Sequence, residues 1–319
     1  MNFLLIDFGA SHLKSIVYNK ETNSFSNSQV STSPLANADK LSKDKVLRAI
    51  QNTLRKYQSV DAVVMCSVLG GYYVNDVYYS WKCADKPPRP EEDSCLLSEL
   101  FKDQNTYHIH AHQSKNSTIE GLKILGRWND ILFYSALGDT NCVIASVTLL
   151  KNELLINLGT GSQVISQNHE GKHELTSFIP SGRALNSFKL FFDSFDINLF
   201  DEFAGLTLQD LEKSTMTFDL NVFPQSYRYT DGGSIRNILE TNFNKENFIS
   251  SLFRSYLEQY LEFISSRKAT KVFLAGGISK RYSLIENFLG YKSGLPVTTT
   301  SFIYEDTHIG MVNLIKQYL

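Results

Sequence analysis

The sequence has no long apolar stretch, since none of its apolar segments approaches the roughly 20 residues of a membrane-spanning helix. It also lacks a strong charge of either sign: 31 Lys and Arg against 33 Asp and Glu give a formal net charge of -2. This balance gives no electrostatic reason to expect nucleic acid or an anionic lipid surface as a partner. We therefore expect neither a membrane nor nucleic acid among its partners.

Cysteine is scarce, and no two of the four residues Cys66, Cys83, Cys95 and Cys142 form a C-x-x-C pair. Cys66 and Cys142 lie in apolar or helix-like contexts and are expected to be small core residues. The segment 1–7 has no basic leader and only a short apolar run, so it predicts a first strand rather than a signal peptide. These features favour a reducing, cytoplasmic location.

Two common nucleotide-binding motifs are absent, because neither G-x-G-x-x-G nor G-x-x-x-x-G-K-[ST] occurs. Rossmann dinucleotide sites and P-loop sites are therefore disfavoured. The chain has instead three short glycine motifs, each preceded by an apolar run that predicts a buried strand. They are IDFGASHLK at 6–14, NLGTGS at 157–162 and LAGGISK at 274–280.

Apolar runs and helical periodicity divide the chain into two similar halves. Buried strands are predicted over 3–7, 61–67, 131–136, 154–157 and 271–275. Each half starts with a strand, a glycine turn and a second strand, and later alternates strands with helices. This is the pattern of an α/β domain that occurs twice.

The boundary between the halves is expected near 148–153, which gives an N-terminal domain over 1–149 and a C-terminal domain over 150–319. The clearest helix is predicted from 246 to about 267, and another from 281 to 289. The order of the three glycine motifs suggests that the two halves face one nucleotide across a cleft.

The first glycine motif places Asp7 at the end of a buried strand, where a carboxylate without a partner is costly. A divalent cation would satisfy it directly or through water, because hard cations take carboxylate oxygens. Gly9 and Ser11 form a tight turn whose backbone N–H groups can approach phosphate oxygens. Lys14 can neutralise a phosphate or pair with a carboxylate. A plain hairpin with a capping Asp is an equal alternative.

The second glycine motif, Gly159, Thr160, Gly161 and Ser162, repeats this design. Its glycines permit a close approach of phosphate to the backbone, and its hydroxyl groups can donate hydrogen bonds. Taken alone, this motif is also a common hairpin.

The third glycine motif places Gly276 and Gly277 between a strand that ends at Ala275 and a helix predicted from Arg281. Glycine at this point allows a flat ring or a phosphate to lie on the backbone at a helix N-terminus.

Asp139 is the strongest single candidate for a catalytic residue, because it lies where a predicted strand becomes a helix. Open α/β sheets hold their ligands at the carboxyl ends of the strands. An aspartate that faces a cleft there could accept a proton from an alcohol. A helix cap is the alternative, and spacing alone favours it.

Taken together, these motifs resemble those of the FGGY carbohydrate kinases, within the actin, sugar kinase and Hsp70 ATPase superfamily, of which this chain would be an unusually short member. The resemblance covers nearly the whole chain in the right order. Segment 7–14 resembles the first phosphate motif, 138–145 the glycine–aspartate motif at the first connecting helix and 155–163 the second phosphate motif. Segment 274–280 resembles the adenosine motif, and 305–310 the start of the second connecting helix.

The resemblance implies two ribonuclease H-like, actin-like ATPase domains with ATP in the cleft between them. It implies transfer of the γ-phosphate of Mg-ATP to a hydroxyl of a ketose-like sugar or polyol, with Asp139 as general base and Asp7 organising Mg²⁺. Trp81 and Asp85, which are weakly similar to a segment near the family's sugar site, would contact the substrate together with Asp139. The nucleotide would be bound by Gly9, Ala10, Ser11, Lys14, Gly159, Thr160, Gly161, Ser162, Gly276, Gly277 and Lys280.

Two other functions stay open. One is a nucleotide-driven switch or assembly protein of the same superfamily, and the other is a kinase-like binding protein without activity. A homodimer is also left open. Two helices, which begin near Asp139 and Thr307, are expected to form a hinge, where the small residues Ala145 and Gly310 let them cross closely.

The sequence also contains three alternating histidines, His108, His110 and His112. Three histidines can bind zinc. No acidic or cysteine ligand stands beside them, however, so a solvent-facing strand or loop is favoured.

Overall fold

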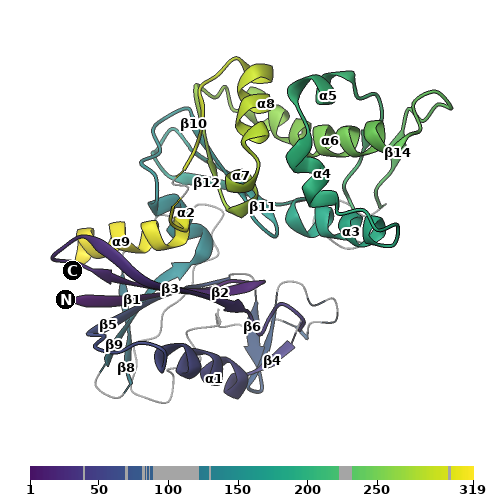
Figure 1. Cartoon of the computed structure of the whole chain (residues 1–319). Coiled ribbons are helices and arrows are strands. Elements are labelled where there is room, and N and C mark those ends of the chain that lie inside the picture. Colours follow the sequence, from purple (N-terminus) through teal and green to yellow (C-terminus); the bar gives the residue numbers. More distant parts are fainter. Residues whose placement is uncertain are drawn as a thin grey trace. The chain divides into compact units, whose positions relative to one another are not determined.

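The computed structural model describes residues 1–38, 40–68, 71–80, 83, 85, 87–88, 122–128, 131–222, 232–300 and 303–319. They divide into unit 1, Met1–Thr148 with Tyr304–Leu319, and unit 2, Leu149–Ile303 (Figure 1). The helix at 306–318, within the range that the sequence assigns to the second domain, packs in unit 1. The predicted residues Trp81, His108, His110 and His112 lie outside the described part of the chain.

Unit 1 is built on a sheet with the strand order β3-β2-β1-β5-β9-β8. Its antiparallel part contains β1 (Asn2–Phe8), β2 (His12–Asn19) and β3 (Ser24–Thr32). Strands β5 (Ala62–Ser67) and β9 (Ile131–Gly138) run parallel to β1, and β8 (Lys123–Trp128) is antiparallel to β9. Strand β5 is buried along its whole length, which explains its continuous apolar run.

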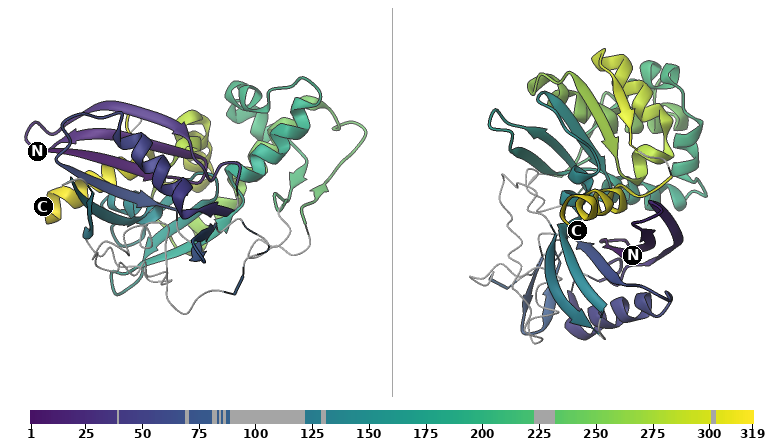
Figure 2. Two further views of the ribbon diagram at one scale, coloured as in Figure 1. Left: turned by 90° about the horizontal axis from the view of Figure 1, so that it is seen from below. Right: turned by 90° about the vertical axis from the view of Figure 1, so that its left-hand side faces the viewer.

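Helices cover both faces of this sheet. Successive side chains of β1 point to opposite faces, so they pack against different helices. Leu4 and Ile6 pack in one cluster with residues of α1 (Lys43–Leu54). Phe3 and Leu5 pack in another cluster with residues of α9 (Asp306–Tyr318), the yellow helix that lies along the sheet in Figure 2. The unit also contains α2 (Asp139–Ala145) and a small sheet of β4 (Lys40–Ser42), β6 (Tyr72–Val74) and β7 (Val77–Tyr79).

Unit 2 has a sheet with the order β12-β11-β10-β15-β16. Strands β10 (Glu153–Leu158), β11 (Ser162–Gln167) and β12 (His173–Ile179) are antiparallel neighbours. Strands β15 (Lys271–Ala275) and β16 (Val297–Thr299) run parallel to β10. The order and the strand directions are those of β3-β2-β1-β5-β9 in unit 1, so the same mixed α/β arrangement occurs in both units.

The helices of unit 2 pack around α6 (Lys245–Ser266), which confirms the helix predicted from 246 to about 267. Its buried residues Phe253, Tyr256 and Tyr260 belong to the main cluster of the unit. The other helices are α3 (Gly182–Asp193), α4 (Leu199–Gly205), α5 (Leu208–Lys213), α7 (Gly277–Arg281) and α8 (Ser283–Ser293). No helix in the described part of the chain has the length and apolar character needed to cross a bilayer.

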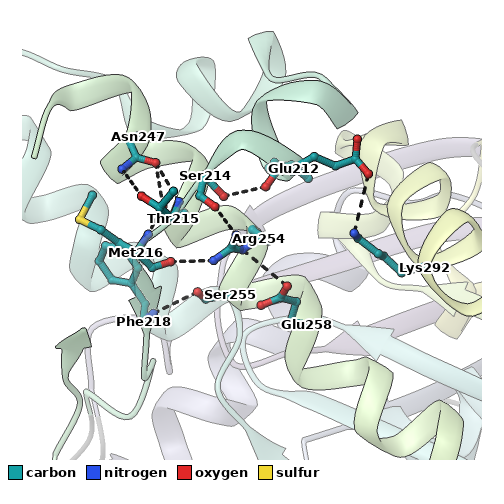
Figure 3. Close-up of polar contacts among 12 residues, drawn as sticks. Glu212, Ser214, Thr215, Met216, Phe218, Asn247, Arg254, Ser255, Glu258 and Lys292 are labelled. Carbon is teal, nitrogen blue, oxygen red and sulfur yellow. Dashed lines mark hydrogen bonds and ion pairs between the residues drawn. The ribbon is translucent and has the colours of Figure 1, made fainter. Parts of the chain in front are cut away.

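Polar side chains of α6 hold the extended segment that follows α5 and contains β13 (Thr217–Phe218), the partner of β14 (Ile235–Arg236) (Figure 3). Arg254 donates hydrogen bonds to the carbonyl oxygens of Ser214 and Met216. Asn247 Oδ1 accepts a hydrogen bond from Thr215 N at 3.0 Å. These bonds satisfy backbone groups that would otherwise be unpaired beside the core.

Candidate active site

The Asp7 side chain lies near the carboxyl end of β1 and is 6% exposed. Its Oδ2 accepts a hydrogen bond from Thr307 Oγ1 at 2.9 Å, and Cys66 Sγ lies 3.7 Å from Oδ1 as a weak donor. Burial raises the pKa of Asp7, although the nearby Lys14 and the Thr307 hydroxyl oppose this change. The carboxylate is therefore buried with hydrogen-bond donors around it.

Lys14 is the residue opposite Asp7 in the β1–β2 register, but its ion pair is with another carboxylate. Lys14 Nζ lies 2.7 Å from Glu305 Oε2, just before α9 begins. Burial lowers the pKa of Lys14, but Glu305 and Asp7 outweigh it and raise the pKa overall. Of the two roles that the sequence allowed, the structure shows pairing with a carboxylate.

The first glycine turn uses one of its amides internally. Gly9 N donates to His12 O at 3.0 Å, and a Cβ on Gly9 would lie 2.8 Å from the same oxygen. Ser11 O accepts from Ser33 N at 3.0 Å. The Gly9 amide thus closes the hairpin.

Asp139 is the first residue of α2 and follows β9 directly. Because β1 and β9 both run parallel to β5, their carboxyl ends lie at the same edge of the sheet. Gly138 is the N-cap residue and α2 has no side-chain cap, so the helix-cap alternative does not describe Asp139. The sequence prediction of a carboxylate at the strand-to-helix junction is confirmed.

The Asp139 carboxyl group is half-buried, and only one of its oxygens is occupied by described residues. Oδ1 accepts hydrogen bonds from Thr140 N at 2.7 Å and from Thr140 Oγ1 at 3.3 Å. Burial, followed by the negative charge of Asp7, raises the pKa of Asp139 to about 7. A carboxyl group with this pKa can exchange a proton with a reacting group near neutral pH.

Helix α9, which carries Thr307, packs tightly against α2, which begins with Asp139. A Cβ on Gly310 would lie 1.8 Å from Cys142 O, so only glycine fits at this crossing. Asn313 Nδ2 donates to Ala145 O at 2.8 Å. The close crossing predicted from the small residues is confirmed within unit 1, while the role as a hinge stays a prediction.

The second glycine turn, between β10 and β11, is fixed by the start of α3. Gly182 N donates to Gly159 O at 3.0 Å, and Arg183 N donates to Thr160 O at 2.8 Å. A Cβ on Gly161 would meet no atom within 4 Å, so space is open beside the turn.

The Ser162 hydroxyl serves the fold of unit 2. It is fully buried, donates to Ile179 O at 3.2 Å and shares a hydrogen bond of 2.7 Å with Tyr260 OH. The sequence suggested that the hydroxyls of this motif could donate to a ligand. The Ser162 hydroxyl is therefore used inside unit 2.

The third glycine motif brings the ends of β10 and β15 together. Gly276 has a φ of 90°, and a Cβ there would lie 2.4 Å from Leu158 O. Gly277 begins α7, and a Cβ there would meet nothing within 4 Å. A helix therefore begins at Gly277, earlier than the predicted start at Arg281, because the tight approach at Gly276 turns the chain at once.

Asp85 lies on the surface of unit 1, with 78% of its side chain exposed. Its Oδ2 pairs with Lys40 Nζ at 2.6 Å, and the hydrogen bond from Lys40 lowers the pKa of Asp85.

Cys66 and Cys142 are fully buried free thiols, as predicted.

The sequence missed Thr307 and Glu305 as partners of Asp7 and Lys14. Both lie in segment 305–310, which the sequence singles out only as the start of a helix. Their partners are about 300 positions away, and no local pattern links such distant residues.

The described residues contain no group of three or more His, Cys, Asp or Glu that could hold a metal ion. Mg²⁺ does not need one, because it keeps several waters and is usually held by one or two carboxylates together with phosphate oxygens. Asp7 and Asp139 interact electrostatically and offer hard oxygen ligands at one edge of the sheet. These residues fit a magnesium ion that binds together with a phosphate ligand.

No protein-family model and no curated protein match this sequence. Solved structures do match. A ligand-bound xylulose kinase from Lactobacillus acidophilus is 11% identical, with a TM-score of 0.68 over 99% of this chain and 89% of that chain. A gluconate kinase from the same organism is 11% identical, with a TM-score of 0.65 over 99% of this chain and 89% of that chain.

A glycerol kinase from Plasmodium falciparum, solved with ADP, is 10% identical, with a TM-score of 0.61 over 100% of this chain and 90% of that chain. At such identities the similarity shows the fold alone. The chain therefore has the mixed α/β fold of these sugar kinases, which is consistent with the predicted ribonuclease H-like fold.

Proposed function

We propose that this protein is a cytoplasmic ATP-dependent kinase that transfers the γ-phosphoryl group of Mg-ATP to a hydroxyl of a ketose-like sugar or polyol. The observation that carries the proposal is the placement of Asp7 and Asp139 at one edge of the unit 1 sheet. The fold shared with xylulose, gluconate and glycerol kinases supports it.

Asp139 acts as the general base. Thr140 holds Oδ1, so Oδ2 is the oxygen that accepts the proton of the substrate hydroxyl. As that proton moves to Oδ2, the hydroxyl oxygen forms a bond to the γ-phosphorus, and the bond to the leaving ADP breaks. The raised pKa of Asp139 makes this carboxylate a better base than an ordinary aspartate.

Asp7 would hold a magnesium ion, which would supply positive charge to the phosphates. The backbone amides of Ala10 and Ser11, and those of residues 159–162, bind the phosphate oxygens. The backbone of Gly276 and Gly277, with Lys280, would bind the adenosine. Lys14 acts through its ion pair with Glu305 and through the charge that it places near Asp7. Trp81 and Asp85 contact the sugar or polyol substrate in this proposal.

A coupled ADP-release assay over ketoses, polyols and heptoses tests the proposal. We expect ADP release that depends on one class of acceptor. Asp139→Asn should lower kcat by about 10²- to 10⁴-fold, the usual contribution of a general base, and spare ATP binding. Asp44→Asn is the matched control, because Asp44 is an exposed aspartate in the first turn of α1.

ATP binding without acceptor-dependent turnover would contradict the kinase proposal. It would favour the nucleotide-driven switch or the inactive binding protein. An Asp139→Asn variant with normal turnover would refute the assignment of the base.

A further inference from the structure

The two oxygens of the Asp7 carboxylate are held unequally. Oδ2 accepts an O–H···O hydrogen bond of 2.9 Å from Thr307, which is a normal length. Oδ1 has only the Cys66 thiol at 3.7 Å, and a thiol is a weak donor. Among the described residues, Oδ1 is thus the oxygen with capacity for a further ligand.

The Thr307 hydroxyl is itself fixed by its surroundings. Thr307 is the second residue of α9 and is 8% exposed. Its β-branched side chain has few rotamers in a helix. Helix α9 cannot shift easily, because Gly310 contacts the backbone of Cys142 and the Glu305–Lys14 ion pair holds its start.

We propose that Thr307 is a positioning residue for Asp7, whose hydroxyl holds Oδ2 and thereby presents Oδ1 to the metal–nucleotide complex. The inference rests on the proposed function, since it assumes that Asp7 binds the metal. It assigns a specific task to the start of α9.

Replacing Thr307 by valine keeps the shape of the side chain and removes only the donor. The Asp7 carboxylate can then rotate about its side-chain bonds, and Oδ2 competes with Oδ1 for the metal. Orientation of a ligand by a second group typically changes metal affinity by about 10- to 100-fold. We expect Thr307→Val to weaken binding of Mn²⁺ with ADP by about 10-fold.

The experiment is a titration of Mn²⁺ in the presence of ADP, followed by electron paramagnetic resonance of free Mn²⁺, on the full chain. Thr307→Ser keeps the hydroxyl and should restore wild-type affinity. Thr53→Val is the matched control, because Thr53 is 3% exposed in the same unit and donates to Ala49 O at 2.9 Å within α1. This control should bind as tightly as the wild type.

A double-mutant cycle separates positioning from a general loss of structure. If Thr307 acts through Asp7, Thr307→Val should have no further effect on Mn²⁺ affinity in an Asp7→Asn background. If Thr307→Val does not fold, Thr307→Cys replaces it. A thiol is a weaker hydrogen-bond donor than a hydroxyl, so the Thr307→Cys variant should bind Mn²⁺ with ADP less tightly than the Thr307→Ser variant. Equal affinities of the two variants would overturn the inference.

The outcomes distinguish a failure of the proposed function from a failure of the role of Thr307. If the wild type binds no Mn²⁺ with ADP, the proposed function fails, and this inference fails with it. If the wild type binds and Thr307→Val binds equally well, Thr307 has no positioning role, whereas the proposed function stands. An equal loss of affinity in Thr53→Val would also overturn the role of Thr307.

Discussion

The raised pKa of Asp139 makes the stability of the protein depend on pH in a direction that can be stated in advance. Its ordinary value is 3.8 and its value in the folded protein is about 7. Between these values the unfolded chain has lost the proton and the folded protein has kept it. A rise in pH within this range therefore lowers the free energy of unfolding. The contribution of Asp139 is most favourable below about pH 4, falls as the pH rises and levels off above about pH 7.

The size of the effect follows from the difference in pKa. At about 1.4 kcal/mol for each pKa unit, the free energy of unfolding falls by about 4 kcal/mol in total, of which roughly 2.5 kcal/mol falls between pH 5 and pH 8. Asp139→Asn removes the titration, and the asparagine Oδ1 can still accept the bonds from Thr140. The variant should therefore gain roughly 2.5 kcal/mol relative to the wild type over that range.

Urea denaturation at pH 5 and pH 8 measures this gain. Asp44→Asn, at an exposed position in α1, is the matched control. A difference between Asp139→Asn and the wild type that stays constant, or shrinks as the pH rises, would refute the raised pKa. In the active enzyme, the same ionisation predicts that kcat/KM rises with pH and levels off above about pH 7.

Two glycine substitutions test the close backbone contacts. Gly276→Ala should lower the free energy of unfolding by about 3 kcal/mol or more, because its φ is positive and its Cβ would lie 2.4 Å from Leu158 O. Gly277→Ala, where a Cβ meets nothing within 4 Å, should change it by less than about 1 kcal/mol, and equal effects in denaturation would contradict the contact. Gly310→Ala should lower the thermal midpoint of unit 1 and leave that of unit 2 unchanged, since its Cβ would lie 1.8 Å from Cys142 O. A wild-type midpoint for unit 1 would refute the tight crossing.

Strands with continuous apolar runs were predictable because most of their side chains are buried. The runs at 3–7, 61–67 and 271–275 coincide with β1, β5 and β15. Strand β3 gave no such signal, because its sequence SFSNSQVST is polar and almost wholly exposed. An edge strand on a solvated face needs no apolar residues, and its place in the sheet comes from pairing with β2.

Asp7 and Asp139 were predictable as candidate site residues because each is a carboxylate at or directly after the end of an apolar strand. The site was not predictable where a contact joins distant parts of the chain. The hydroxyl of Ser162 illustrates the limit, because its burial depends on Tyr260, which is 98 positions away. A motif can indicate that a hydroxyl is present, but tertiary packing decides which partner it meets.

The hydrogen bond between Asp7 and Thr307 can form only late in the synthesis of the chain. The two residues are 300 positions apart, and at ribosomal speeds of about 5–20 residues per second the hydroxyl is synthesised about 15 to 60 s after the carboxylate. The residues of unit 2, Leu149–Ile303, are all made within this interval. The whole of unit 2 is therefore synthesised before helix α9, which completes unit 1. A chain that terminates before Thr307 would carry the Asp7 carboxylate in its first strand without the Thr307 hydroxyl that donates to it.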